Sequence, residues 1–368
     1  MNLSALFQPF ELGPVRLPNR IAMAPMTRQK SPGEVPGEDV AAYYARRAAG
    51  GVGLIITEAT PVDDPAASPA GDIPAFDARA ASGWAAVRQA VHAAGGRIMP
   101  QLWHLGIVRW AANSPRPEAP SVSPSGLLRP GKVVGEPISE TRIAEVIDAF
   151  ARSARLAQEL GFDGVELHGA HGYLIDQFFW DGTNLRSDAW GGDLAGRARF
   201  GVEILRAVRR ATSPDFPVIL RWSQWKTDNY QVKLAADPRA LEQFLAPLAE
   251  AGVTAFHCST RRFWEPEFPD TGSSLNLAGW TKKVTGLPTI TVGSIGLDRA
   301  DSRATRSETV AISSERLLDL NRGVEQGEFD LVAIGRALLA NPEWANLVKA
   351  GRLSELRPYG ADALDVLT

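Results

Sequence analysis

Short apolar runs alternate with amphipathic segments along most of the chain, and this alternation restricts the possible folds more than any other feature of the sequence. The apolar runs have the length of buried strands and lie at residues 20–26, 53–59, 97–103, 164–168, 217–223, 255–260, 289–294 and 329–335. Apolar residues at three- and four-residue spacing predict helices between them, for example at residues 38–51, 83–96, 145–161, 198–211 and 238–252. Strands that alternate with helices require a parallel sheet with crossover connections. Eight such units predict an α/β fold in which residues 1–368 form a single closed (β/α)8 TIM barrel; an open, doubly wound sheet is the alternative.

Two insertions interrupt this rhythm. Residues 113–138, rich in Pro, Ser and Gly, follow the third predicted strand, and the polar residues 297–312 extend the loop after the seventh. Both therefore belong to loops after strands, which form the active-site face of such barrels. Residues 126–132 fit the start of a phosphate-binding P-loop, but Val133 stands where Ser or Thr is needed and no strand or helix flanks the segment. We predict a hairpin there, and the absence of any G-x-G-x-x-G argues against a Rossmann site.

The composition is that of a globular protein without a strongly charged partner. The chain carries 39 basic and 42 acidic residues, for a net charge of −3, and no block of like charges indicates a nucleic-acid surface. Its only cysteine, Cys258, excludes disulfides within the chain and metal clusters held by thiolates. No secretory signal is apparent, and no run of about 18 apolar residues predicts a membrane span. We therefore expect a soluble cytoplasmic protein, a monomer or a homodimer, with neither nucleic acid nor membrane as a partner.

Residues at the carboxyl ends of barrel strands face the active site. In this chain those positions include two arginines, an amide, two histidines and a phenol. The residues are Pro25, Thr27, Ala59, Gln101, Trp103, His168, His171, Tyr173, Arg221, Gly293, Ser294, Gly335 and Arg336. Small residues after the seventh and eighth strands expose backbone N–H groups beside an arginine, which is typical of the phosphate site of such barrels. The alternative is that these glycines only close tight turns.

The spacing of His168 and His171, with Tyr173 two residues later, leaves three roles open. By the two-residue period of a strand, Glu166 and His168 share a face that points into the barrel, and we expect His171 and Tyr173 in the loop at its mouth. The pair could supply two ligands of a metal site, which needs a further ligand. The histidines could also be structural, or they could donate two hydrogen bonds to a substrate oxygen.

Four segments, taken in order, resemble the old yellow enzyme family of FMN-dependent ene-reductases. They are residues 6–28, residues 161–179 (GFDGVELHGAHGYLIDQFF), residues 186–200, and the VGSIG sequence from residue 292 together with residues 329–344. The resemblance spans nearly the whole chain and implies the barrel already predicted, with tightly but non-covalently bound FMN and with NADPH or NADH as reductant. The chain departs from the commonest pattern at SDAWGG, where Thr-Asp-Glu-Tyr-Gly-Gly is common, and at Gly196, where Asn is usual.

The resemblance also implies roles for the residues at the strand ends. Thr27 would hydrogen-bond the redox-active edge of the flavin, with the backbones of Pro25 and Ala59 alongside. The pyrimidine edge would be held by Gln101 and Arg221, and the phosphate by Gly293, Ser294, Gly335 and Arg336. A buried arginine suits reduced flavin, which carries negative charge near its N1–C2=O edge, although Arg221 could equally be a structural ion-pair partner.

By the same resemblance, the enzyme would be an NAD(P)H:flavin oxidoreductase or alkene reductase with ping-pong kinetics. His168 and His171 would bind the oxygen of an enone, enal, maleimide or nitroalkene that takes hydride at its β-carbon, and Tyr173 would protonate the α-carbon. Apart from the resemblance, we expect Trp103 at the end of the third strand and Trp264 at the exit of the sixth to line the substrate pocket. Two other classes remain as alternatives, namely a metal-dependent barrel hydrolase or lyase that uses His168 and His171, and a non-catalytic flavin-binding protein.

Overall fold

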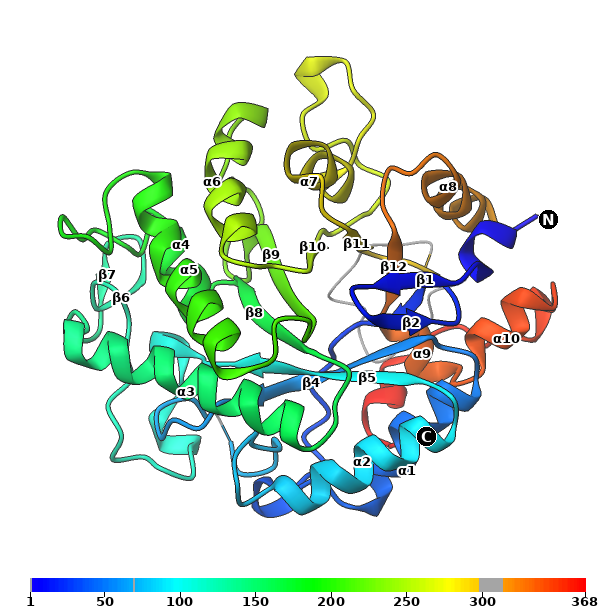
Figure 1. The fold of residues 1–368 in the computed structure, drawn as a ribbon, viewed down its shortest axis with the longest axis horizontal. Helices are drawn as coiled ribbons and strands as arrows, with labels where there is room; N and C mark the ends of the chain where they lie inside the picture. Colours follow the sequence, from blue (N-terminus) through cyan, green and yellow to red (C-terminus); the bar gives the residue numbers. More distant parts are fainter. Residues whose placement is uncertain (1, 69, 298–313) are drawn as a thin grey trace.

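In the computed structural model, which describes residues 2–68, 70–297 and 314–368, eight parallel strands close into a barrel (Figure 1). Around the barrel the strand order is β10-β11-β12-β3-β4-β5-β8-β9. The bounds are β3 (Ile21–Met23), β4 (Leu54–Pro61), β5 (Arg97–Trp103), β8 (Val165–His171), β9 (Val218–Lys226), β10 (Ala255–Ser259), β11 (Thr289–Val292) and β12 (Leu331–Ile334). All eight predicted strands are confirmed, and closure of the sheet excludes the doubly wound alternative.

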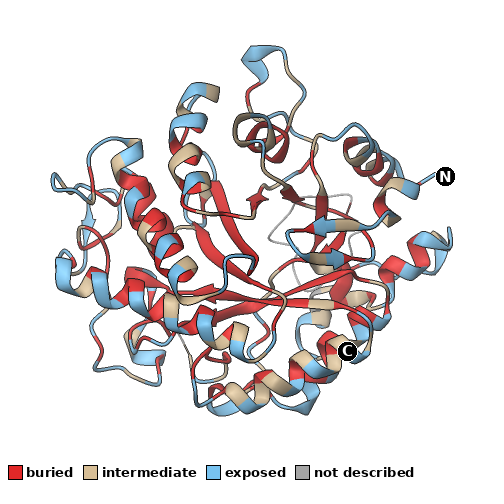
Figure 2. Cartoon of the chain, viewed as in Figure 1, coloured by how far each residue is buried: buried red, intermediate tan, exposed pale blue. Residues whose placement is uncertain are grey.

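The helices lie outside the barrel, and the longer ones bury one face against it, which is the pattern of buried and exposed stretches in Figure 2. The longer helices are α1 (Glu38–Ala49), α2 (Ala81–Ala93), α3 (Glu140–Glu159), α5 (Leu194–Ala211), α6 (Pro238–Glu250), α7 (Leu277–Thr285) and α8 (Ser314–Glu325). The shorter ones are α4 (Leu174–Phe179), α9 (Arg336–Ala340) and α10 (Trp344–Lys349). Local sequence fixes where several of them begin: the side chains of Ser139, Asp193 and Asp237 accept hydrogen bonds from the backbone N–H groups of the first helical turn. None of the helices within the described ranges is both long and apolar enough to span a bilayer.

An N-terminal hairpin, β1 (Phe10–Leu12) with β2 (Val15–Leu17), adds its buried leucines to the apolar interior of the barrel. That interior also contains the small or aliphatic side chains of Leu54, Ile219 and Leu331, near the starts of their strands. The amino end of the barrel is therefore filled with apolar side chains, and space for a ligand is left to the carboxyl end.

The insertion after the third barrel strand forms an antiparallel hairpin of β6 (Leu127–Arg129) and β7 (Lys132–Val133), as predicted, rather than a P-loop. The second insertion lies outside the described residues except for Leu297. One prediction was wrong: β8 continues as far as His171, which pairs with Lys226, so this histidine ends the strand instead of lying in the following loop. The pairing register between β8 and β9 shifts between Gly169 and His171, and after this shift His171 still pairs with β9, so the strand extends to it.

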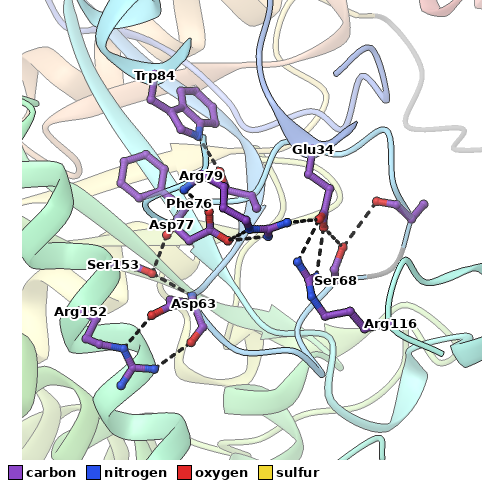
Figure 3. Close-up of polar contacts among 12 residues, drawn as sticks. Glu34, Asp63, Ser68, Phe76, Asp77, Arg79, Trp84, Arg116, Arg152 and Ser153 are labelled. Atoms are coloured by element: carbon purple, nitrogen blue, oxygen red, sulfur yellow. Dashed lines mark hydrogen bonds and ion pairs between the residues drawn. The ribbon is translucent and has the colours of Figure 1, made fainter. Parts of the chain in front are cut away.

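A single buried carboxylate joins the loops that follow β3, β4 and β5 (Figure 3). Glu34 accepts hydrogen bonds from Ser68 Oγ (2.8 Å), from Arg79 Nη1 (3.1 Å) and from Arg116 Nη2 (3.0 Å). Its backbone is left-handed (φ 65°), an uncommon conformation for a residue with a side chain. The surrounding contacts hold it there, so three loops of the active-site face share one anchor.

We expect Glu34→Ala to lower the free energy of unfolding by about 1–3 kcal/mol, because three donors lose a common acceptor while the two arginines remain partly exposed to water. Glu34→Gln keeps an acceptor at the same place and should lose less. Urea denaturation of both variants measures the difference. Equal stability of Glu34→Ala and the wild type would mean that the loops are anchored elsewhere.

Candidate active site

The carboxyl ends of the strands open into a cavity of about 280 Å³ that brings together six of the predicted cofactor-binding residues. They are Pro25, Arg221, Gly293, Ser294, Gly335 and Arg336. They come from segments far apart in the sequence, and only closure of the barrel makes them neighbours. Gly293 leaves no room for a larger residue, because a Cβ there would lie 2.5 Å from Thr260 Oγ1.

A second cavity, of about 410 Å³, lies beside the first and shares His171 with it. Trp103, Tyr173 and Trp180 form part of its wall, and Leu128 of the β6–β7 hairpin contributes to its lining. The wall is therefore mainly apolar and aromatic. The polar residues of its lining are Arg129, His171, Tyr173, Gln177, Thr183, Thr227 and Asp228.

Of the other predicted residues, His171 alone lines the first cavity, Trp103 and Tyr173 line only the second, and His168 lines neither. Thr27 is exposed and follows Met26, which lines the first cavity. Ala59 is buried in a small cluster against which Tyr173 packs, and Gln101 lies inside the barrel. Trp264 lines neither cavity; the guanidinium of Arg316 lies 4.4 Å from its ring centre. Their proposed roles stay predictions.

The rings of His168, His171, Tyr173 and Trp103 form one aromatic cluster. The centroid of His168 lies 5.1 Å from that of His171 and 4.9 Å from that of Tyr173, and the Tyr173 ring lies 4.9 Å from Trp103, each pair edge to face. Burial, together with the nearby charge of Arg221, lowers the pKa of both histidines well below the ordinary value. Burial raises the pKa of Tyr173, an effect that Arg221 partly opposes. The cluster therefore contains two neutral imidazoles and a protonated phenol at neutral pH.

His171 is held in a left-handed conformation (φ 67°) by contacts to its backbone and ring. Its N–H donates to Ser223 Oγ (3.1 Å), and its carbonyl oxygen accepts from Thr227 Oγ1 (2.8 Å). The ring stacks on Trp225 at 4.5 Å, and its Nε2 lies 2.8 Å from Ser259 Oγ. These contacts fix the direction in which the imidazole enters the cavities.

Beneath this cluster lies a buried polar network that the sequence analysis missed. Glu166 accepts a hydrogen bond from Gln101 Nε2 (2.7 Å), and its other oxygen lies 2.7 Å from His257 Nδ1. Strand register puts Arg221 opposite His168 on one side and His257 on the other. The available signal was the two-residue alternation that puts His257 and Ser259 on one strand face, as it does Glu166 and His168.

The geometry offers donors for an anion rather than ligands for a metal. No group of three or more His, Cys, Asp or Glu side chains is placed to hold a metal ion within the part of the chain that the structure describes. Arg221 Nε is buried and has no acceptor among the described residues. An anionic ligand edge near it would supply that acceptor.

Comparison with known proteins decides what kind of ligand this is. The sequence profile of the NADH:flavin oxidoreductase / NADH oxidase family matches residues 5–355. The chain belongs to this family, the old yellow enzyme family. It is therefore an FMN-dependent NAD(P)H oxidoreductase, and the hydrolase and non-catalytic alternatives are set aside.

Several members of the family are similar to the chain over most of their length. The 12-oxophytodienoate reductase 2 of Arabidopsis thaliana is 33% identical over 92% of this chain and 86% of its own. A chanoclavine-I aldehyde reductase of Penicillium roqueforti is 35% identical over 95% of this chain and 90% of its own. Among solved structures, morphinone reductase superposes with a TM-score of 0.78 at 28% identity, covering 98% of this chain and 92% of its own.

The residues present fit FMN. A flavin mononucleotide needs a polar partner for its ring edge and a cationic, sterically open place for its phosphate. Arg221, with its unpartnered Nε, faces the cavity on one side, and Arg336 lines it beside Gly293 and Gly335. The cavity therefore offers both features within one continuous wall.

One buried carboxylate near the cavity carries a testable pH dependence. Glu58 Oε2 accepts the backbone N–H of Arg28 (2.8 Å) and of Gln29 (3.4 Å), directly after Thr27. Burial raises the pKa of Glu58 to about 7, which the two backbone hydrogen bonds only partly oppose. A folded-state pKa above the unfolded one means that Glu58 stabilises the fold fully below the unfolded pKa, and that this stability is lost as pH rises through about 7.

We expect Glu58→Gln, which cannot ionise, to be more stable than the wild type at pH 8.5 by about 2–4 kcal/mol, the equivalent of this shift. The difference should disappear near pH 4.5, where both side chains are neutral. Thermal unfolding at several pH values measures it. A Glu58→Gln variant that is less stable than the wild type at every pH would show that the carboxylate stabilises the loop in its charged form.

Proposed function

We propose that this enzyme reduces activated alkenes, with bound FMN supplying hydride transfer from NAD(P)H to the β-carbon of an enone, enal, maleimide or nitroalkene. The observation that carries the proposal is the ring cluster of His168, His171 and Tyr173, in which His171 lines both cavities, Tyr173 lines the second, and His168 packs edge to face against both rings. Related proteins named as reductases of 12-oxophytodienoate, chanoclavine-I aldehyde and morphinone support it.

In this proposal the wall of the first cavity holds the cofactor. The phosphate is held by Gly293, Ser294, Gly335 and Arg336, and the pyrimidine edge by Gln101 and Arg221. Thr27, with the backbones of Pro25 and Ala59, lies along the redox-active edge. What supports these roles is that most of the residues line one cavity and that Arg221 Nε lacks an acceptor among the described residues.

The two histidines orient the substrate through its oxygen. Each is a neutral imidazole with one N–H to donate, and Nδ1 of His168 accepts the N–H of Ala170 (3.4 Å), which leaves its other nitrogen as the donor. Hydride arrival at the β-carbon puts enolate charge on that oxygen. Because both hydrogen bonds strengthen as the charge develops, the pair lowers the barrier as well as binding the substrate.

Tyr173 supplies the proton for the α-carbon. Its raised pKa keeps the phenol protonated at neutral pH, and the rings of Trp103 and His168 hold it beside the substrate cavity. The competing role is an aromatic wall, in which only the ring matters. In the same proposal Trp103 lines the substrate pocket. Trp264 would have to move from its position beneath the Arg316 guanidinium to contribute to that pocket.

An anaerobic visible spectrum tests the function directly. Purified enzyme should be yellow, lose its colour on addition of NADPH, and regain it when 2-cyclohexenone or another activated alkene is added without oxygen. Recovery of the colour with oxygen but with none of the four alkene classes would favour an NADH oxidase instead.

The phosphate assignment predicts the effect of Arg336→Ala. Loss of a charge-assisted contact worth roughly 1.5–3 kcal/mol should weaken FMN binding by about 10- to 150-fold. Fluorescence titration of the apoprotein with FMN measures this affinity, and Arg206→Ala on the outer face of α5 is the control. FMN affinity equal to that of the wild type would remove Arg336 from the phosphate site.

The proton-donor assignment predicts the effect of Tyr173→Phe, which keeps the ring and removes the proton. Enone reduction should slow by about 10²–10⁴, while flavin reduction by NADPH, which needs no such proton, should change little. Nitroalkenes should suffer less in the hydride step, because the nitronate is stable enough to leave before it is protonated. Stopped-flow measurement of both half-reactions decides this, with Tyr230→Phe as control, and equal slowing of the two contradicts the assignment.

A further inference from the structure

A fully buried ion pair lies directly behind the histidine cluster. Lys226 Nζ, from the end of β9, lies 2.7 Å from Asp176 Oδ1 on α4, and both side chains are 0% exposed. Neither residue has a role in the proposed reaction. Removing two charges from water costs several kcal/mol per ion, and an apolar pair of similar volume is often as stable or more stable. The pair therefore needs an explanation other than stability.

The pair is connected to the backbone that carries His171. The second carboxylate oxygen of Asp176 accepts the N–H of Gly172 (2.7 Å), the residue after His171. On the other side, Lys226 is paired in register with His171, and Thr227 Oγ1 donates to the His171 carbonyl oxygen (2.8 Å). The His171–Gly172 peptide is thus held from α4 and from β9 at once, and the ion pair joins these two holders.

His171 needs such a clamp because its backbone conformation is unfavourable. A non-glycine residue at φ 67° is strained, and it persists only where the surroundings determine it. In this conformation the imidazole stacks on Trp225 and lines both cavities. Relaxation to an ordinary strand conformation would turn the ring away from them.

We propose that Asp176 and Lys226 are positioning residues that hold His171 in its left-handed conformation and so aim its imidazole at the substrate oxygen. The pair touches neither substrate nor cofactor in this role, and it acts only through the His171–Gly172 peptide. The proposal rests on the proposed function, because it presumes that His171 donates to an oxygen in the cavity.

The test replaces the ion pair without leaving an unpaired charge. In Asp176→Leu/Lys226→Met the apolar side chains replace the pair, so the unfolding midpoint should stay close to or above that of the wild type. Binding of 4-nitrophenol, whose oxygen mimics a developing enolate, should nevertheless weaken by about tenfold or more in calorimetric titration of the holoenzyme. A folded double variant that binds 4-nitrophenol as tightly as the wild type overturns the proposal.

His171→Ala separates failure of this proposal from failure of the proposed function. Binding of 4-nitrophenol that is unchanged in His171→Ala removes the histidine as a donor, whatever the ion pair does. If His171→Ala weakens binding, adding it to the double variant should cause no further loss, because both changes remove the same interaction. Additive losses contradict action through His171.

Asp176→Asn provides a second measurement should the double variant fail to fold. It is nearly isosteric, but it removes the negative charge and puts an NH2 donor where one of the two acceptor oxygens was, so we expect a partial loss of 4-nitrophenol affinity, about three- to tenfold. Lys226→Arg keeps a cation for Asp176 and should retain more affinity than Lys226→Met. Wild-type affinity in both Asp176→Asn and Lys226→Met overturns the positioning role.

Discussion

A buried positive charge at the mouth of the barrel governs the groups around it. Arg221 remains protonated although burial lowers its pKa, because guanidinium groups do not lose their proton in proteins. Its charge adds to burial in lowering the pKa of His168 and His171, and it opposes the rise that burial causes at Tyr173. The site therefore combines fixed cations, among them Arg221 and Arg336, with neutral donors. The positive charges and the neutral donors both stabilise an anion that forms in the cavity, and no proton has to be taken up first. Electrostatic catalysis requires such preorganised groups.

The barrel can bury this charge because its inward-facing side chains change from apolar to polar along the strands. Near the amino end the inward side chains are apolar, such as Ile219 and Leu331. Towards the carboxyl end Glu166 provides the countercharge, and Gln101 and His257 satisfy both of its oxygens. A buried carboxylate with two such partners is far less costly than an isolated one. The same two-residue period produces both layers, so the polar layer arises from residue choice at alternate positions and needs no irregular backbone.

The sequence predicted what depends on local pattern and missed what depends on contacts between distant segments. Strands and helices follow from apolar spacing within each segment, so all eight barrel strands were found. The hairpin was predicted because residues 126–132 lack the Ser or Thr, and the flanking strand and helix, of a P-loop. The Asp176–Lys226 pair was invisible, because nothing near either residue indicates the other. His257 carried no signal beyond strand alternation. Trp264 was expected at the pocket because it follows a strand, and its ring contacts Arg316, which is distant in sequence.

Backbone strain in the described residues is concentrated on the active-site face. The non-glycine residues with positive φ are Gln29, Glu34, His171 and Ser294, and each follows or ends a barrel strand at its carboxyl end. A strained backbone conformation of this kind persists only where the surrounding structure holds it in place. A closed barrel supplies such surroundings at one rim, since each of its strands is hydrogen-bonded to two neighbours along part of its length. Two of the strained residues, His171 and Ser294, line the first cavity, and Glu34 joins loops of the same face. The regularity of the barrel wall is thus what allows irregular residues to be placed where a ligand can be bound.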